Sequence, residues 1–135
     1  MISQDEDKVP AKALPTVLFI DDDERLLESL RLALRREPYE ILTVTSTERA
    51  SRVLAQRKVD VVVCDERMPT MTGTTFLTQM KNAAHPAIRI VLTGAGRPAE
   101  DRAANQAAVF RFLTKPCSSS AIALAIREAL QHIPL

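Results

Sequence analysis

The stretch Val59–Thr70, VDVVVCDERMPT, places an aspartate directly after a run of apolar, mostly β-branched residues. Val59–Cys64 has the length and composition of a buried strand, and Asp65 stands at its end. An aspartate in this position can simply cap a loop, or it can take part in chemistry if other polar side chains reach the same place. The rest of the chain decides between these two interpretations.

Further apolar runs of strand length alternate with segments of helical periodicity. The other expected strands are 17–20, 41–44, 88–92 and 109–113, and the expected helices are 25–36, 47–56, 74–82, 98–106 and 120–132. Five strands alternating with five helices predict βαβ units and a parallel sheet covered on both faces. Residues 1–14 mix charge with proline and lack periodicity, so we expect a flexible tail before one domain at 15–135.

Composition excludes several classes of protein. The 135 residues are 46% apolar, enough for one sizeable core, and 18 basic against 17 acidic residues leave a net charge of +1. Bulk charge therefore points to neither nucleic acid nor a membrane surface, and no apolar run is long enough to span a bilayer. Cys64 and Cys117 lack the spacing of a disulfide framework or a zinc site, which is typical of a reducing cytoplasm. We expect a soluble, cytoplasmic protein.

Polar residues follow four of the five expected strands. They are Asp21, Asp22 and Asp23 after the first strand, Asp65 after the third, Thr93 after the fourth and Lys115 after the fifth. Ligands of open parallel sheets bind outside the carboxyl ends of the strands, so these side chains share one rim. Each has an ordinary structural explanation taken singly, such as a helix cap or a solvated charge. Their location at the same rim favours a functional site, because neighbouring carboxylates repel one another unless a cation lies among them.

Carboxylates with a backbone carbonyl and waters suit a hard cation, Mg²⁺, with Mn²⁺ as a substitute. A metal held by Asp21, Asp22 and Asp65 would leave positions open for phosphoryl oxygens, which Lys115 and the Thr93 hydroxyl can also bind. Asp65 is then the nucleophile that becomes an aspartyl phosphate. Asp23 is interpreted as a charge at the start of the following helix rather than as a ligand.

Four segments give these residues a specific family resemblance. They are VLFIDDDERLLESL, VDVVVCDERMPTMTG, IRIVLTG and FRFLTKP, which are similar in order and spacing to the signatures of the receiver domain of bacterial two-component response regulators. The resemblance covers about residues 15–134. It implies a flavodoxin-like, doubly wound α/β fold with strand order 2-1-3-4-5, an order for which receivers are a standard example. It also implies a cis peptide bond between Lys115 and Pro116.

The resemblance assigns roles residue by residue. Asp21 and Asp22 match the acidic pair that holds the metal, Asp65 the phosphoacceptor, Arg67 the residue whose carbonyl completes the metal shell, Thr93 and Phe112 the switch residues, and Lys115 the phosphate-binding lysine. Two positions depart from the usual pattern. Ala107 stands where a glycine is common before the last strand, and Cys117 where an aromatic residue is common; the cysteine is interpreted as a small apolar filler rather than a redox group. The Arg67 side chain is either solvated or tunes the lifetime of the phosphate.

The expected function is that of a phosphoacceptor signalling domain. A sensor histidine kinase or a phosphotransfer protein would supply the phosphoryl group, and an effector domain, an effector protein or a homodimer would receive the signal through helix 98–106, strand five and helix 120–132. Such a domain promotes only its own phosphorylation and dephosphorylation, and is not expected to bind nucleic acid or membranes itself. Two alternatives are a small phosphatase with an aspartate nucleophile and an interaction module that does not depend on phosphorylation. The first is disfavoured because Arg25 stands where such phosphatases want Thr or Val, the second because no expected site residue is lost.

Overall fold

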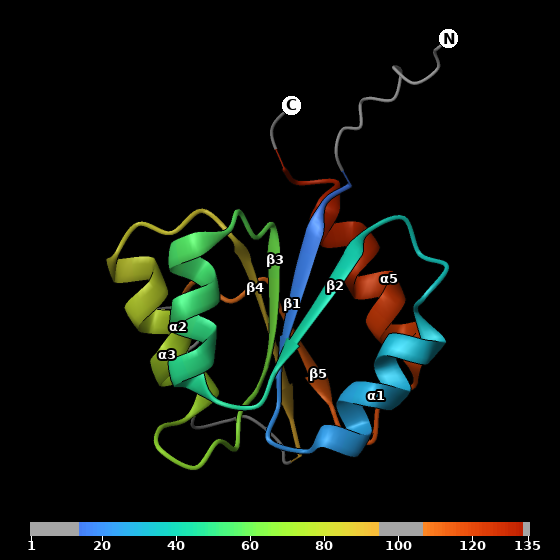
Figure 1. The fold of residues 1–135 in the computed structure, drawn as a ribbon, viewed down its shortest axis with the longest axis horizontal. Helices are drawn as coiled ribbons and strands as arrows, with labels where there is room; N and C mark the ends of the chain where they lie inside the picture. Colours follow the sequence, from blue (N-terminus) through green and yellow to red (C-terminus); the bar gives the residue numbers. More distant parts are fainter. Residues whose placement is uncertain (1–13, 95–106, 134–135) are drawn as a thin grey trace, which may run out of the picture.

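The computed structural model describes residues 14–94 and 107–133, which are built around a parallel sheet. Its strands are β1 (Thr16–Ile20), β2 (Glu40–Val44), β3 (Val61–Asp65), β4 (Ile88–Thr93) and β5 (Arg111–Thr114). Their order is β2-β1-β3-β4-β5, and every neighbouring pair runs parallel (Figure 1). The predicted fold class and strand order are confirmed.

Helices cover both faces of the sheet, as Figure 1 shows. One face carries α1 (Glu24–Ala33) and α5 (Ser119–Leu130), and the other carries α2 (Thr47–Gln56) and α3 (Gly73–Asn82). No helix in the part of the chain that the structure describes is long and apolar enough to cross a membrane. The sheet is therefore the middle layer of three, with a separate apolar core on each side.

The central strands supply side chains to both cores by simple alternation. Val17 and Phe19 of β1 pack toward α1 and α5, whereas Leu18 and Ile20 pack toward α2 and α3. All four are at most 1% exposed, and full burial of such a side chain contributes about 1.5–3 kcal/mol. A strand that is buried on both faces has a continuous run of apolar residues in its sequence. For this reason, the apolar runs in the sequence predicted β1 and β3.

Each of the four helices α1, α2, α3 and α5 begins at a side-chain cap. Asp23, Ser46, Thr72 and Ser118 are the N-caps of α1, α2, α3 and α5, and each accepts a hydrogen bond from a backbone N–H in the first turn of its helix. Such a cap stabilises a helix by about 1 kcal/mol. Asp23 thus lies at the start of the helix, as predicted, with its side chain engaged in the cap.

The strand and helix ends differ from prediction where tertiary contacts decide them. Strand β3 was expected to end at Cys64, but it includes Asp65, because Asp65 lies in register with Leu92 of β4 and the next N–H, that of Glu66, donates to the Leu92 carbonyl at 2.8 Å. Helix α1 was expected to reach Arg36 and instead ends at Ala33. Beyond Ala33 the chain forms turns instead, in which the N–H groups of Arg35 and Glu37 donate to the carbonyls of Leu32 and Leu34 at 3.5 and 3.0 Å.

The entry to β5 also differs from prediction. This strand was expected from Val109 but begins at Arg111, because Ala108 adopts a left-handed conformation with φ of 52°. The irregular residue is thus Ala108 and not Ala107, which is fully buried and whose carbonyl accepts a hydrogen bond of 2.7 Å from Arg89 Nε. The predicted tail at 1–14, apart from its last residue, and the predicted helix at 98–106 lie outside the described residues.

Replacing Ala108 with glycine is expected to stabilise the protein. The left-handed conformation costs an alanine about 1–2 kcal/mol, and the greater freedom of glycine in the unfolded chain offsets part of the gain, so the expected increase is about 0.5–1 kcal/mol. Ala107→Gly is the matched control. It removes a buried methyl group from a helical residue and should lower stability by about 1 kcal/mol. Urea unfolding measures both variants, and a loss of stability in Ala108→Gly would contradict the explanation.

Candidate functional site

The carboxyl ends of β1, β3, β4 and β5 bring the predicted polar residues to one rim of the sheet. Asp21 and Asp22 directly follow β1, Asp65 and Thr93 are the last residues of β3 and β4, and Lys115 directly follows β5. The parallel register aligns these ends, since Asp65 pairs with Leu92. The rim predicted from the sequence is therefore formed by the fold itself.

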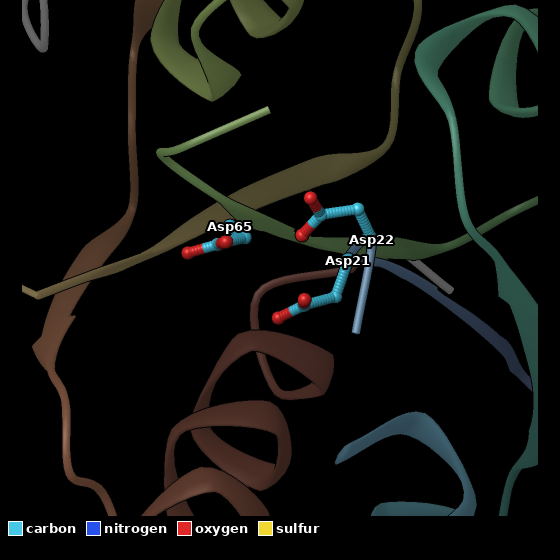
Figure 2. A group of neighbouring side chains, drawn as sticks. All are labelled: Asp21, Asp22 and Asp65. Carbon is cyan, nitrogen blue, oxygen red and sulfur yellow. The ribbon is translucent and has the colours of Figure 1, made fainter. Parts of the chain in front are cut away.

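Three carboxylates meet at this rim. Asp21, Asp22 and Asp65 each place a carboxylate oxygen within 4.8 Å of the others, and Figure 2 shows the three side chains projecting into the same space. Asp21 is 3% and Asp65 7% exposed, whereas Asp22 is exposed to solvent. The cluster is thus buried on the side of the sheet and open on the side of Asp22.

Lys115 reaches two of these carboxylates. Its Nζ lies 3.1 Å from Asp21 Oδ2 and 3.2 Å from Asp65 Oδ1, and its backbone N–H donates to the Thr93 carbonyl at 2.7 Å. Burial by itself would lower the pKa of Lys115, but the bonds to Asp21 and Asp65 outweigh it and raise that pKa. The lysine is therefore held as a cation between the two acids. The Lys115-Pro116 peptide bond is cis, as predicted.

In the folded protein, the ionised form of the Asp21 carboxyl is disfavoured. Its burial raises its pKa, and the nearby charge of Asp65 adds to this, although the Asp23 N–H at 2.9 Å and the Lys115 ammonium act in the opposite direction. One ammonium cannot balance three ionised carboxylates. The candidate metal ligands in this cluster are all carboxylate oxygens, which are hard ligands. Their excess negative charge fits a divalent cation such as Mg²⁺.

A glycine lets α3 begin against the end of β3. At Gly73, a Cβ atom would press on the carbonyl oxygen of Asp65 and lie 3.1 Å from Cys64 Sγ. Any larger residue would push the helix away from the strand that carries Asp65. No role for this glycine follows from the sequence alone, since its close contact arises only once β3 and α3 are packed together.

The remaining predicted residues lie around the cluster, and their roles stay predictions. Thr93 is 3% exposed at the end of β4, and Phe112 of β5 is partly buried against the core on the side of α2 and α3. The Arg67 side chain is exposed in the loop after β3. Cys117 packs partly buried against the other core, in agreement with its interpretation as a filler, and burial raises the pKa of its thiol.

Comparison with protein families gives one match that covers most of the chain. Residues 17–127 match the family described as the response regulator receiver domain. Among curated proteins, the chain is 38% identical over 116 residues to the transcriptional regulatory protein GlrR of Escherichia coli K12, and 34% identical over 118 residues to the hydrogenase transcriptional regulatory protein HoxA of Cupriavidus necator. Each alignment covers 86% of this chain but only 26% and 24% of the respective relative. The chain thus spans about a quarter of the length of these relatives.

Solved structures agree with this result. The signal receiver domain of an HD domain-containing protein from Pseudomonas fluorescens Pf-5 superposes with a TM-score of 0.81 at 32% identity, covering 88% of both chains. A response regulator receiver domain protein from Clostridium thermocellum gives a TM-score of 0.79 at 28% identity, over 87% of this chain and 95% of that one.

Asp21→Asn is expected to stabilise the protein when no divalent cation is present. The folded state binds the Asp21 proton more tightly than the unfolded chain does, so ionisation of this carboxyl lowers stability as the pH rises above its ordinary pKa of 3.8. Asparagine keeps an oxygen for the Asp23 N–H but carries no charge. In EDTA at pH 7 the variant should melt a few degrees above the wild type, and the difference should shrink as the pH approaches 3.8.

Asp23→Asn is the matched control for this experiment. It makes the same chemical change two residues away, at an exposed helix cap where asparagine serves as well as aspartate. Its melting temperature should stay close to that of the wild type. An Asp21→Asn variant that melts below the wild type in EDTA would contradict the claim that the ionised Asp21 carboxylate lowers stability.

Proposed function

The chain belongs to the response regulator receiver domain family, and from this premise we propose that it takes up a phosphoryl group on the carboxylate of Asp65. The observation that carries the proposal is the pairing of Asp65 with the Lys115 ammonium at 3.2 Å, inside a rim of further carboxylates. A carboxylate at the end of a strand with a fixed cation beside it is equipped to be a nucleophile toward phosphorus. The proposed domain comprises residues 15–135.

The proposed donor is a phosphohistidine of a sensor kinase or of a phosphotransfer protein. A carboxylate oxygen of Asp65 forms the new bond to phosphorus, the bond from phosphorus to the histidine nitrogen breaks, and that nitrogen keeps the electron pair and takes a proton. The Lys115 ammonium is placed to balance the negative charge of the phosphoryl oxygens. The Thr93 hydroxyl, at the end of the adjacent strand, is the proposed second donor to those oxygens.

We propose Mg²⁺, with Mn²⁺ as a substitute, as the cation of this site. The carboxylates of Asp21, Asp22 and Asp65 and the carbonyl of Arg67 would hold it. When bound, such an ion supplies positive charge to the phosphoryl oxygens and relieves the repulsion among the acids. The exposure of Asp22 supports the proposal, since it leaves a side of the cluster open for an ion to enter.

The proposed signal starts from the added charge. A phosphoryl group brings about −1.5 to −2 charges and three acceptor oxygens, which draw the Thr93 hydroxyl toward Asp65 and free space for the Phe112 ring. Both conformations exist beforehand, and phosphorylation shifts their populations. The proposed output is a surface that includes β5 and α5 and signals to an effector domain, an effector protein or a second copy of the chain, in the cytoplasm.

Asp65→Asn is expected to abolish phosphoryl uptake without loss of the fold. The amide keeps the shape of the side chain but loses its nucleophilic charge. Wild type incubated with acetyl phosphate and Mg²⁺ should gain the mass of one base-labile phosphoryl group by intact mass spectrometry, and the variant none. Asp23→Asn should gain it like the wild type. A phosphoryl group on Asp65→Asn at the wild-type rate would reject Asp65 as the acceptor.

Thr93→Ala is expected to separate phosphoryl uptake from its signal. Protein labelled with fluorophenylalanine has four fluorine resonances, because the chain holds four phenylalanines, and Phe112→Leu identifies the one of interest. Beryllofluoride, a phosphoryl mimic, should move the Phe112 resonance in the wild type, and this response should be largely lost in Thr93→Ala, which still binds the mimic. An unchanged response in Thr93→Ala would show that the signal takes another route.

A further inference from the structure

Glu66, the residue after the proposed phosphoacceptor, is bound on three sides. Its N–H donates to the Leu92 carbonyl on β4 at 2.8 Å, and its own carbonyl accepts from the Gly73 N–H at 2.9 Å. Its side-chain Oε1 accepts from both the backbone N–H, at 2.9 Å, and the hydroxyl of Thr74, a residue that is only 2% exposed. One residue thus ties the end of β3 to β4 and to the first turn of α3.

These bonds close the β3–α3 loop, residues 66–72, at both ends. The closure brings the N-terminus of α3 back to the residue that follows Asp65, and the absence of a side chain at Gly73 permits it. Hydrogen bonds to a carboxylate are stronger than neutral ones, and a negative charge is favoured at a helix N-terminus. The Glu66 carboxylate therefore has more influence on the shape of this loop than an ordinary polar side chain.

The backbone of Arg67 is fixed by its two neighbours. Glu66 precedes it, and Met68, which follows it, is only 8% exposed and packs into the core on the side of α2 and α3. Farther along the loop, the Thr70 hydroxyl lies 3.3 Å from that of Thr47 in α2. The Arg67 side chain itself is exposed, so packing of this side chain does little to fix the carbonyl, and the anchored residues on either side are the ones that hold it.

We propose that Glu66 is a positioning residue for the cation site, whose carboxylate holds the loop so that the Arg67 carbonyl faces the three aspartates. This role rests on the proposed cation site and goes beyond it, since Glu66 binds no cation itself. The competing explanation is that Glu66 only stabilises the start of α3. The two differ in one measurable respect, because a helix cap affects stability, whereas a positioning residue affects the affinity for the cation.

Calorimetric titration of the full chain with Mg²⁺, repeated with Mn²⁺, tests the proposal. Glu66→Ala should bind about tenfold more weakly than the wild type, the effect of losing a charge-assisted hydrogen-bonded anchor. Glu66→Gln keeps an oxygen for the Thr74 N–H and hydroxyl but loses the charge, so its affinity should lie between those of Glu66→Ala and the wild type. Thr74→Val, which keeps the shape but removes the hydroxyl donor, should weaken binding in the same direction by a smaller factor, and remains informative if Glu66→Ala does not fold.

Thr72→Ala is the matched control. The Thr72 hydroxyl caps α3 by accepting from the Thr75 N–H at 3.1 Å, so its loss weakens the same helix without touching Glu66. It should lower the melting temperature in EDTA and leave Mg²⁺ affinity at the wild-type value. Wild-type affinity in folded Glu66→Ala, or an equal loss of affinity in Thr72→Ala, would overturn the positioning role, as would a wild type that binds no cation.

The outcome is independent of phosphoryl uptake. A wild type that binds Mg²⁺ but gains no phosphoryl mass from acetyl phosphate would overturn the proposed function, while the ratio of Mg²⁺ affinities between wild type and Glu66→Ala would still support the role of Glu66. Normal phosphoryl uptake together with equal Mg²⁺ affinities in the wild type and Glu66→Ala would support the proposed function and overturn the positioning role of Glu66.

Discussion

The ion pairs of Lys115 are the interaction on which the site depends. Its ammonium joins the end of β5 to the ends of β1 and β3, at 3.1 Å from Asp21 and 3.2 Å from Asp65, and the first of these pairs spans 94 residues of sequence. Both carboxylates are less than a tenth exposed, so without this cation they would be buried charges with less compensation. The parallel sheet makes the arrangement possible, because it delivers strands distant in sequence to one rim.

Much of this architecture follows from local patterns in the sequence. β1 and β3 are buried on both faces, so their apolar runs are continuous, and the helices between them show helical periodicity. Once the strands are parallel, their carboxyl ends must share an edge, and Asp21, Asp65 and Lys115 stand at those ends in the sequence. The location of the site was therefore predictable, whereas the strand order came from the family resemblance.

The details that the sequence did not predict arise from contacts between elements. Gly73 matters because the Asp65 carbonyl lies against it, and Glu66 because Thr74 returns to it after the loop. Ala107 was identified as standing in place of a glycine that is common before the last strand, but the left-handed residue at this turn is its neighbour, Ala108. Such features depend on how β3, β4 and α3 pack, and periodicity carries no information about them.

Borohydride trapping tests most directly whether Asp65 is the phosphoacceptor around which these contacts are organised. Borohydride reduces an aspartyl phosphate to homoserine and leaves free carboxylates unchanged, so the modified residue is identified by peptide mass spectrometry after incubation with a phosphodonor and Mg²⁺. The expected result is homoserine at position 65 and at no other acidic residue. Homoserine at Asp21, Asp22 or Asp23 with an unmodified Asp65 would contradict it.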